Sequence, residues 1–172
     1  MDKIICLIGE SGSGKSTIAK YLEGDGYNYI KSYTTRPKRN SEEEGHVFVE
    51  ESFFKKLKKH EIIAYAEFDD YKYWSTTNQY RNKGISIYVI EPKGAVELKK
   101  SLYDCEVIII YLKVDKEERL KRMKNDRGLV MARRRLKHED KTGVFNVIKC
   151  DYVLDGNRDM PKVISDIRNI IK

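Results

Sequence analysis

A glycine-rich segment near the N-terminus has the residue types and spacing of a loop that binds nucleotide phosphates. Residues 9–17 read Gly-Glu-Ser-Gly-Ser-Gly-Lys-Ser-Thr, which matches the pattern G-x-x-x-x-G-K-[ST]. The glycines let successive backbone N–H groups converge on phosphate oxygens, because no Cβ stands in the way. We expect Lys15 to reach the β- and γ-phosphates of ATP and the Ser16 hydroxyl to bind Mg²⁺. The residues predicted to bind ATP are Gly9, Ser11, Gly12, Ser13, Gly14, Lys15, Ser16 and Thr17.

The segments on either side of this loop have the patterns of a strand before it and a helix after it, which is the context that a phosphate-binding loop requires. Residues 3–8 are apolar after the first, as in a strand buried on both faces of a parallel sheet. After the loop, Ile18, Ala19 and Leu22 recur at helical spacing. The predicted helix points the partial positive charge of its N-terminus at the same anion. A chance glycine-rich turn would not need this strand–loop–helix order, so we favour phosphate binding.

The remainder of the chain narrows the class of phosphate-binding protein. A length of 172 residues disfavours helicases and motor ATPases, and no Asn-Lys-x-Asp run is present to read guanine as in a GTPase. A kinase acting on a phosphorylated acceptor needs cations for a second phosphate and a lid that excludes water. Residues 32–39 combine hydroxyls with two arginines that can bind a phosphate monoester, although such a stretch alone would suggest an exposed basic turn.

Five arginines that crowd around Gly128 offer the cations for the transferring phosphoryl group. We expect about two of them to be catalytic and the others to lie on the surface of a solvated basic helix. These arginines are Arg122, Arg127, Arg133, Arg134 and Arg135.

Strand and helix patterns alternate to the C-terminus and predict an α/β fold of the P-loop NTPase type, a parallel sheet sandwiched by helices. Residues 32–84 break this rhythm with short aromatic and polar segments, which predicts an inserted small α+β lobe. The expected strands are 85–90, 107–114 and 152–154, and the expected helices are 94–102, 116–124, 132–141 and 161–171.

The net charge of +7 fits either a nucleic-acid surface or a site that gathers phosphates. Much of it lies in residues 55–59, Lys-Lys-Leu-Lys-Lys, which we expect to be the solvated face of a helix. The longest apolar runs are too short to span a membrane, and the N-terminus resembles no signal peptide. Three scattered cysteines predict free thiols in a reducing compartment. We therefore expect a cytoplasmic protein.

The order of motifs along the whole chain resembles the guanylate kinase family. The resemblance implies a core formed by residues 1–31 and 85–172, an acceptor-binding lobe at 32–84 and a short lid at 124–136. It also implies Mg²⁺-dependent transfer of phosphate from ATP to GMP, which yields ADP and GDP. The motifs that carry it are residues 9–17, Ser32-x-Thr34-Thr35-Arg36, Arg39, Glu42, Gly45-x-x-Phe48-Val49, Tyr73-x-Ser75-Thr76, Glu91-x-x-Gly94 and Asp151-Tyr152.

The resemblance also implies roles for single residues. Ser75 would contact the acceptor base, and Glu91 would lie near Mg²⁺-bound water and Arg36. The side chains expected to hold the acceptor phosphate are Ser32, Arg36, Arg39 and Tyr73, and the expected catalytic cations are Lys15, Arg122, Arg127 and Arg134 or Arg135.

Three positions depart from the family pattern. The family has a phosphate-binding tyrosine near His46, whose neutral ring N–H could replace the phenol as a donor. Ala64 stands where the family has a glutamate that reads guanine, and Glu67 could take over only if the strand register shifts locally. Trp74 replaces a glycine and either narrows the acceptor pocket or packs against the inserted lobe. The acceptor base is therefore less well determined than the reaction.

The proposed chemistry is in-line transfer, which needs no general base because the attacking phosphate oxygen is already ionised. The alternatives are a kinase of the same fold with another nucleotide or a phosphosugar as acceptor, a non-catalytic guanylate-kinase-like binding module, and a nucleic-acid-binding protein. We expect small nucleotides as the partners, neither nucleic acid nor membrane, and a monomer or homodimer.

Overall fold

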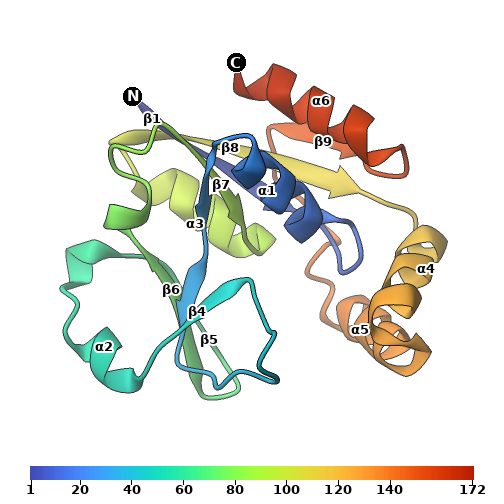
Figure 1. The fold of residues 1–172 in the computed structure, drawn as a ribbon, viewed down its shortest axis with the longest axis horizontal. Coiled ribbons are helices and arrows are strands. Elements are labelled where there is room, and N and C mark those ends of the chain that lie inside the picture. The colour runs from blue at the N-terminus through green and yellow to red at the C-terminus, as the bar shows by residue number, and fades with distance from the viewer.

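The computed structural model describes residues 1–172, and its core is a sheet of five parallel strands (Figure 1). The strand order is β2-β7-β1-β8-β9, and every pair of neighbours is parallel. This arrangement confirms the predicted parallel sheet. The strands are β1 (Asp2–Ile8), β2 (Asn28–Ile30), β7 (Ile85–Val89), β8 (Cys105–Lys113) and β9 (Tyr152–Asp155).

Helices cover both faces of this sheet, which explains why its central strands are continuously apolar. Successive side chains of β1 point to opposite faces, so Ile5 and Leu7 join one core cluster and Ile4 and Cys6 join the other. The first cluster is closed by α1 (Lys15–Gly24) and α6 (Met160–Ile171), and the second by α3 (Pro92–Ser101). All four β1 side chains are fully buried.

Residues 32–84, the range of the predicted lobe, contain a second sheet in the order β4-β3-β6-β5. Strand β3 pairs in parallel with β4 and antiparallel with β6, and β5 pairs antiparallel with β6. Figure 1 shows this lobe beside the core, with α2 on its outer side. The elements are β3 (Ser32–Thr34), β4 (His46–Phe48), α2 (Glu51–Lys55), η1 (Lys59–Glu61), β5 (Ile62–Phe68), β6 (Tyr71–Thr76) and η2 (Thr77–Gln79).

The prediction that residues 55–59 form a helix face was wrong. Helix α2 ends at Lys55, and the chain turns before the single 3-10 turn at Lys59–Glu61. The Glu61 carboxylate accepts a hydrogen bond from the backbone N–H of Lys58 at 2.6 Å, which starts this new turn. Lysines three and four positions apart repel one another on a helix, so a continuous helix would be disfavoured here. The lysines are exposed, as expected.

Helices α4 (Lys116–Arg127) and α5 (Leu129–Thr142) form a hairpin beside the core, visible at the right of Figure 1. They meet at Gly128, whose φ of 83° reverses the chain. A small cluster of Met123, Ala132 and Leu136 packs the two helices together. The predicted lid, residues 124–136, falls on the end of α4 and the first half of α5. None of the helices is long and apolar enough to cross a membrane.

Candidate active site

The glycine-rich loop connects the end of β1 to the start of α1. Gly12 and Gly14 have φ angles of 81° and 93°, a left-handed conformation that glycine adopts without steric cost. A Cβ on Gly12 would lie 2.8 Å from the carbonyl oxygen of Arg119, so a larger residue does not fit against α4. Ser16 and Thr17 are exposed in the first turn of α1. The loop therefore leads into a helix N-terminus whose first turn carries two exposed hydroxyls.

Lys15 is folded back onto this loop. Its Nζ donates hydrogen bonds to the carbonyl oxygens of Gly9 at 2.5 Å and Glu10 at 3.0 Å, and to Ser13 Oγ at 3.2 Å. Burial lowers the pKa of Lys15 to about 8, although the nearby Glu91 carboxylate favours the charged form. The ammonium group is thus held at the loop by weak acceptors and has no counter-ion in hydrogen-bond contact.

Helix α5 is joined to the loop by a carboxylate. Glu139 Oε1 accepts a hydrogen bond from the backbone N–H of Ser11 at 2.7 Å. Its Oε2 lies 3.1 Å from Nη1 of Arg119, which also donates to the carbonyl oxygens of Ser11 and Val114. A backbone donor of the predicted phosphate site is therefore occupied by an anion of the protein itself.

Sequence reasoning missed both Arg119 and Glu139. Arg119 is almost fully buried, and it lies one helical turn before Arg122 on the face of α4 that meets the loop. The three-residue spacing between Arg119 and Arg122 could have indicated from the sequence that Arg119 also faces the loop. Glu139 lies in a charged stretch of α5 that carries no pattern of its own, so only the packing of α5 reveals its contact.

Two of the predicted arginines lie against the loop. Arg122 donates to the carbonyl oxygen of Gly156 at 2.9 Å and lies 3.5 Å from that of Ser13. Arg135 Nη1 lies 3.5 Å from Ser11 Oγ, at the limit of a hydrogen bond. Both side chains approach the loop from the hairpin of α4 and α5.

Arg127 and Arg134 are exposed and make no hydrogen bond or ion pair. Burial lowers the pKa of Arg135, and the positive charges of Arg127 and Arg39 lower it further. The structure thus brings Arg127 and Arg39 into the electrostatic neighbourhood of Arg135. Between the two alternatives Arg134 and Arg135, the geometry favours Arg135.

The residues predicted to bind the acceptor phosphate gather in the second sheet. Ser32 in β3 pairs with His46 in β4, and the His46 ring packs edge-on against the ring of Tyr73 in β6. Arg36 follows β3 directly. Arg36 Nε and His46 Nδ1 are buried and have no hydrogen-bond partner. Burial, followed by the charge of Arg36, lowers the pKa of His46, so this ring is neutral at pH 7.

Glu43 neutralises part of this cationic group. Arg36 donates to both Glu43 oxygens, at 2.6 and 3.2 Å, and the backbone N–H of Arg39 donates at 2.7 Å. The Arg36 hydrogen bond is the main reason that the pKa of Glu43 falls to about 2. The unpartnered Arg36 Nε and the His46 ring beside this pair suit a phosphate better than a second carboxylate, because a phosphate has more acceptor oxygens.

A family model described as guanylate kinase matches residues 1–172. The chain belongs to the guanylate kinase family. The crystal structure of guanylate kinase from Anaplasma phagocytophilum is similar, with 26% sequence identity, a TM-score of 0.62, and coverage of 99% of this chain and 87% of that one. A search of the curated proteins found no significant match. The chain is therefore a nucleoside monophosphate kinase, with the P-loop fold of its family.

Two further predicted residues of this guanylate kinase family member are Ser75 and Glu91. Ser75 is fully buried, and its hydroxyl donates to the hydroxyl of Tyr88 at 2.7 Å. Glu91 precedes α3 as its N-cap residue. Partial burial raises the pKa of Glu91, Lys15 lowers it, and Glu139 raises it again. Glu91 thus belongs to the charged group around the loop, whereas Ser75 faces inward.

The base-reading position of the family shows a backbone irregularity. Ala64 has a φ of 51°, and the pairing of β5 with β6 shifts by one residue between Ile63 and Ala66. Glu67 nevertheless pairs with Lys72 and accepts a hydrogen bond from Tyr65. The register shift therefore occurs, but it does not bring Glu67 to the face of the sheet that carries Tyr73 and Ser75.

Trp74 lies on the other face of β6, opposite to Tyr73 and Ser75. Its ring is fully buried against Tyr33, Phe53 and Phe54, with centroid distances of 5.6, 6.4 and 4.8 Å. Of the two alternatives for Trp74, the structure supports packing against α2 within the inserted lobe.

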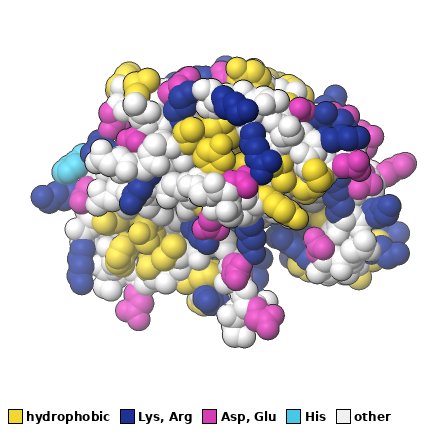
Figure 2. Space-filling view, turned by 45° about the horizontal axis from the view of Figure 1, so that its top comes forward, with side chains coloured by type: hydrophobic (Ala, Val, Ile, Leu, Met, Phe, Trp, Pro, Cys, Tyr) yellow, Lys and Arg dark blue, Asp and Glu magenta, His cyan; other side chains and the backbone are white.

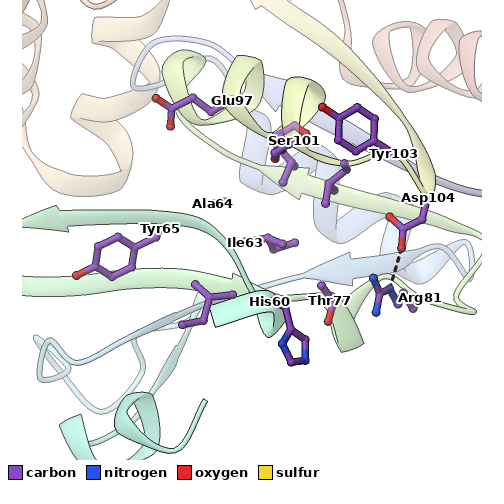
Figure 3. A pocket seen from close by; sticks show the side chains of 13 residues that line it. His60, Ile63, Ala64, Tyr65, Thr77, Arg81, Glu97, Ser101, Tyr103 and Asp104 are labelled. Carbon is purple, nitrogen blue, oxygen red and sulfur yellow. Dashed lines mark hydrogen bonds and ion pairs between the residues drawn. The ribbon is translucent and has the colours of Figure 1, made fainter. Parts of the chain in front are cut away.

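Figure 2 shows a hollow between the lobe and the hairpin of α4 and α5, with Lys and Arg side chains on both sides. A separate open cavity of about 610 Å³ lies between β5 and α3 (Figure 3). Ala64 and Tyr65 line it from β5, and Glu97 and Ser101 from α3. None of the predicted site residues lines this cavity, but it opens beside the position where the family's glutamate is missing.

Proposed function

We propose that this enzyme transfers the γ-phosphoryl group of ATP to GMP with the help of Mg²⁺, releasing ADP and GDP. The observation that carries the proposal is the presence, on one chain, of two groups of residues whose chemistry suits phosphate binding. The loop of residues 9–17 offers a nest for the donor, and the strands of the second sheet offer Ser32, Arg36, His46 and Tyr73 to the acceptor.

The donor side fits a triphosphate with Mg²⁺. No group of three or more His, Cys, Asp or Glu side chains could hold a metal in the protein. Mg²⁺ typically takes only one or two protein ligands and fills its remaining positions with phosphate oxygens and water. The exposed hydroxyl of Ser16 would be its direct ligand, and Glu91 would bind its water. When bound, the ion would neutralise phosphate charge.

The chain's own residues would orient the reactants and offset charge. Lys15, Arg122 and Arg135 would stabilise the transferring phosphoryl group, with Arg127 drawn in as the lid closes. Arg36 and Arg39 would hold the acceptor phosphate in line, with one of its ionised oxygens as the nucleophile. Closure of α4 and α5 over the loop would exclude water.

A different nucleoside monophosphate as acceptor is the second candidate. Ala64 supports it, because an alanine cannot accept hydrogen bonds from the N1–H and 2-amino group of guanine, and Glu67 lies on the opposite face. A nucleic-acid-binding function rests only on the net charge of +7. We also propose a cytoplasmic location, supported by three free cysteines.

The test is a coupled assay of ADP release by the purified protein with Mg²⁺-ATP and a panel of acceptors. The panel contains GMP, AMP, the pyrimidine monophosphates and phosphosugars. We expect the highest kcat/KM with GMP. Turnover with AMP or a pyrimidine nucleotide but not GMP would favour the second candidate, and no turnover with any acceptor would contradict the kinase activity.

A further inference from the structure

Three hydroxyl groups meet where the two sheets join. Tyr88 lies in β7 of the core sheet, and its side chain is 2% exposed. Its hydroxyl lies 2.7 Å from Ser75 Oγ in β6 and 2.9 Å from Ser32 Oγ in β3. The two serines are 3.5 Å apart, at the limit of a hydrogen bond. The only direct link between the two serines is therefore weak, and Tyr88 connects them.

Each of these hydroxyls has a single hydrogen to donate. Ser75 is fully buried, and it donates its hydrogen to the Tyr88 oxygen. The bond between Tyr88 and Ser32 can run in either direction, and because the Tyr88 oxygen already accepts from Ser75, the Tyr88 hydrogen is available for Ser32. This order leaves the hydrogen of Ser32, the one partly exposed member of the group, free to point away from the cluster. In the reverse order, Ser32 would donate inward and present only lone pairs outward.

Ser32 can bind a phosphate monoester well in only one of these two orders of donation. The phosphate oxygens are acceptors only, so an outward Ser32 hydrogen attracts them and an outward lone pair repels them. Successive hydrogen bonds also polarise one another, which makes the last donor of the chain stronger. Ser32 is paired with His46 on the neighbouring strand, and the unpartnered atoms His46 Nδ1 and Arg36 Nε lie in the same group of side chains.

We propose that Tyr88 is a positioning residue that makes Ser32 a dedicated hydrogen-bond donor to the phosphate of the acceptor. This inference rests on the proposed role of Ser32 in acceptor binding. It assigns a role in acceptor affinity to a buried tyrosine that touches no substrate. Because Tyr88 acts on the phosphate, its contribution is the same for every nucleoside monophosphate that the enzyme accepts.

The experiment compares Tyr88→Phe with Tyr80→Phe. Both tyrosines are buried and each loses one hydroxyl, but the Tyr80 hydroxyl donates to Asp104 at 2.8 Å, outside the site. We expect Tyr88→Phe to raise the KM of the acceptor about tenfold, with kcat and the KM of ATP within about twofold of wild type. Tyr80→Phe should leave all three constants within about twofold. Thermal melting of both variants reports their folding.

A double-mutant cycle of Tyr88→Phe with Ser32→Ala tests whether Tyr88 acts through Ser32. If Tyr88 acts through Ser32, the double variant has the same acceptor KM as Ser32→Ala alone. Additive effects would overturn the inference, as would an unchanged acceptor KM in Tyr88→Phe. A loss that differs among acceptor bases would also overturn it, because Tyr88 would then act on the base. If the variants contradict the role of Tyr88 while the wild type turns over, the proposed function stands. A wild type that is inactive on every acceptor would overturn both the proposed function and the role of Tyr88.

Discussion

The carboxylate of Glu139 accepts a hydrogen bond from the backbone N–H of Ser11 at 2.7 Å. The two residues are 128 positions apart, and the contact joins helix α5 to the loop predicted to bind ATP. A carboxylate that occupies a donor of this loop competes with the phosphates of the nucleotide for it. Its charge also repels them. We therefore predict that Glu139 leaves Ser11 when ATP binds.

Replacing Glu139 by Gln should tighten ATP binding. The amide carries no charge, so we expect a decrease of about fivefold in the Kd of ATP, measured by titration calorimetry. The free energy of unfolding should fall by about 1–3 kcal/mol, because buried Arg119 loses its charged partner. Asp140→Asn is the matched control, since Asp140 pairs with Lys116 on the exposed side of α5. Weaker ATP binding by the Gln variant would show that Glu139 assists the nucleotide.

Lys15 should make ATP binding sensitive to alkaline pH. Its pKa in the free protein is about 8, below the ordinary value of 10.5, so the ammonium charge is lost above pH 8. We expect the kcat/KM for ATP to fall up to tenfold per pH unit above about pH 8. The contribution of Lys15 to folding has the opposite trend: the unfolded chain binds the proton more tightly, so stability rises from pH 8 to 10.5.

Lys15→Met should abolish turnover while the protein still folds. The control for the pH profile is Lys20→Met, because Lys20 is exposed on α1 and pairs with Glu44. In Lys20→Met, the kcat/KM for ATP should fall above about pH 8 as it does in the wild type. A profile that is flat between pH 7 and 9.5 in the wild type would contradict the lowered pKa.

Arg135 should matter more than its neighbour Arg133. Arg135 lies 3.5 Å from Ser11 Oγ, whereas Arg133 is exposed and has no partner. We expect Arg135→Ala to lower kcat by about 10²-fold or more, as the loss of one donor to a transition state does. Arg133→Ala should stay within about twofold of wild type. Equal effects in steady-state kinetics would indicate that the charge of the helix, not the position of Arg135, is what matters.

Ala64→Glu should increase the preference for GMP. Ala64 already has a φ of 51°, so a glutamate adds little backbone strain at this position. We expect the ratio of kcat/KM for GMP over AMP to rise about tenfold or more. Glu67→Gln should leave the ratio within about twofold, because Glu67 lies on the opposite face. An unchanged ratio in Ala64→Glu would mean that residue 64 does not face the base.

Trp74 should contribute to stability and not to acceptor binding. Trp74→Ala removes a fully buried ring from between Tyr33 and Phe54. We expect the free energy of unfolding to fall by about 3–5 kcal/mol, measured by urea denaturation with circular dichroism as the signal. Trp74→Phe should lose less, since Trp74 Nε1 has no hydrogen-bond partner to give up. The acceptor KM of Trp74→Phe should match the wild type. A clear change in that KM would place the ring in the pocket.

Much of the fold could be read from the sequence because its signals are local. The apolar run of β1, the glycine-rich loop and the amphipathic α1 are contiguous, and their order predicts a phosphate-binding loop without any knowledge of packing. The strands of the core and most of its helices follow from the same kind of periodicity. The lysine run at 55–59 misled because charge indicates exposure, and exposure does not distinguish a helix from a turn.

The sequence by itself determined the family, and it predicted the loop for the donor and the basic residues for two phosphates. Only the tertiary structure decided which side chains meet: Glu139 with Ser11, Tyr88 with Ser32, and Trp74 with α2. These contacts join residues that lie far apart in the chain, and they depend on how the two sheets and the α4–α5 hairpin pack together. No local pattern encodes that packing, because it results from the burial of many side chains at once.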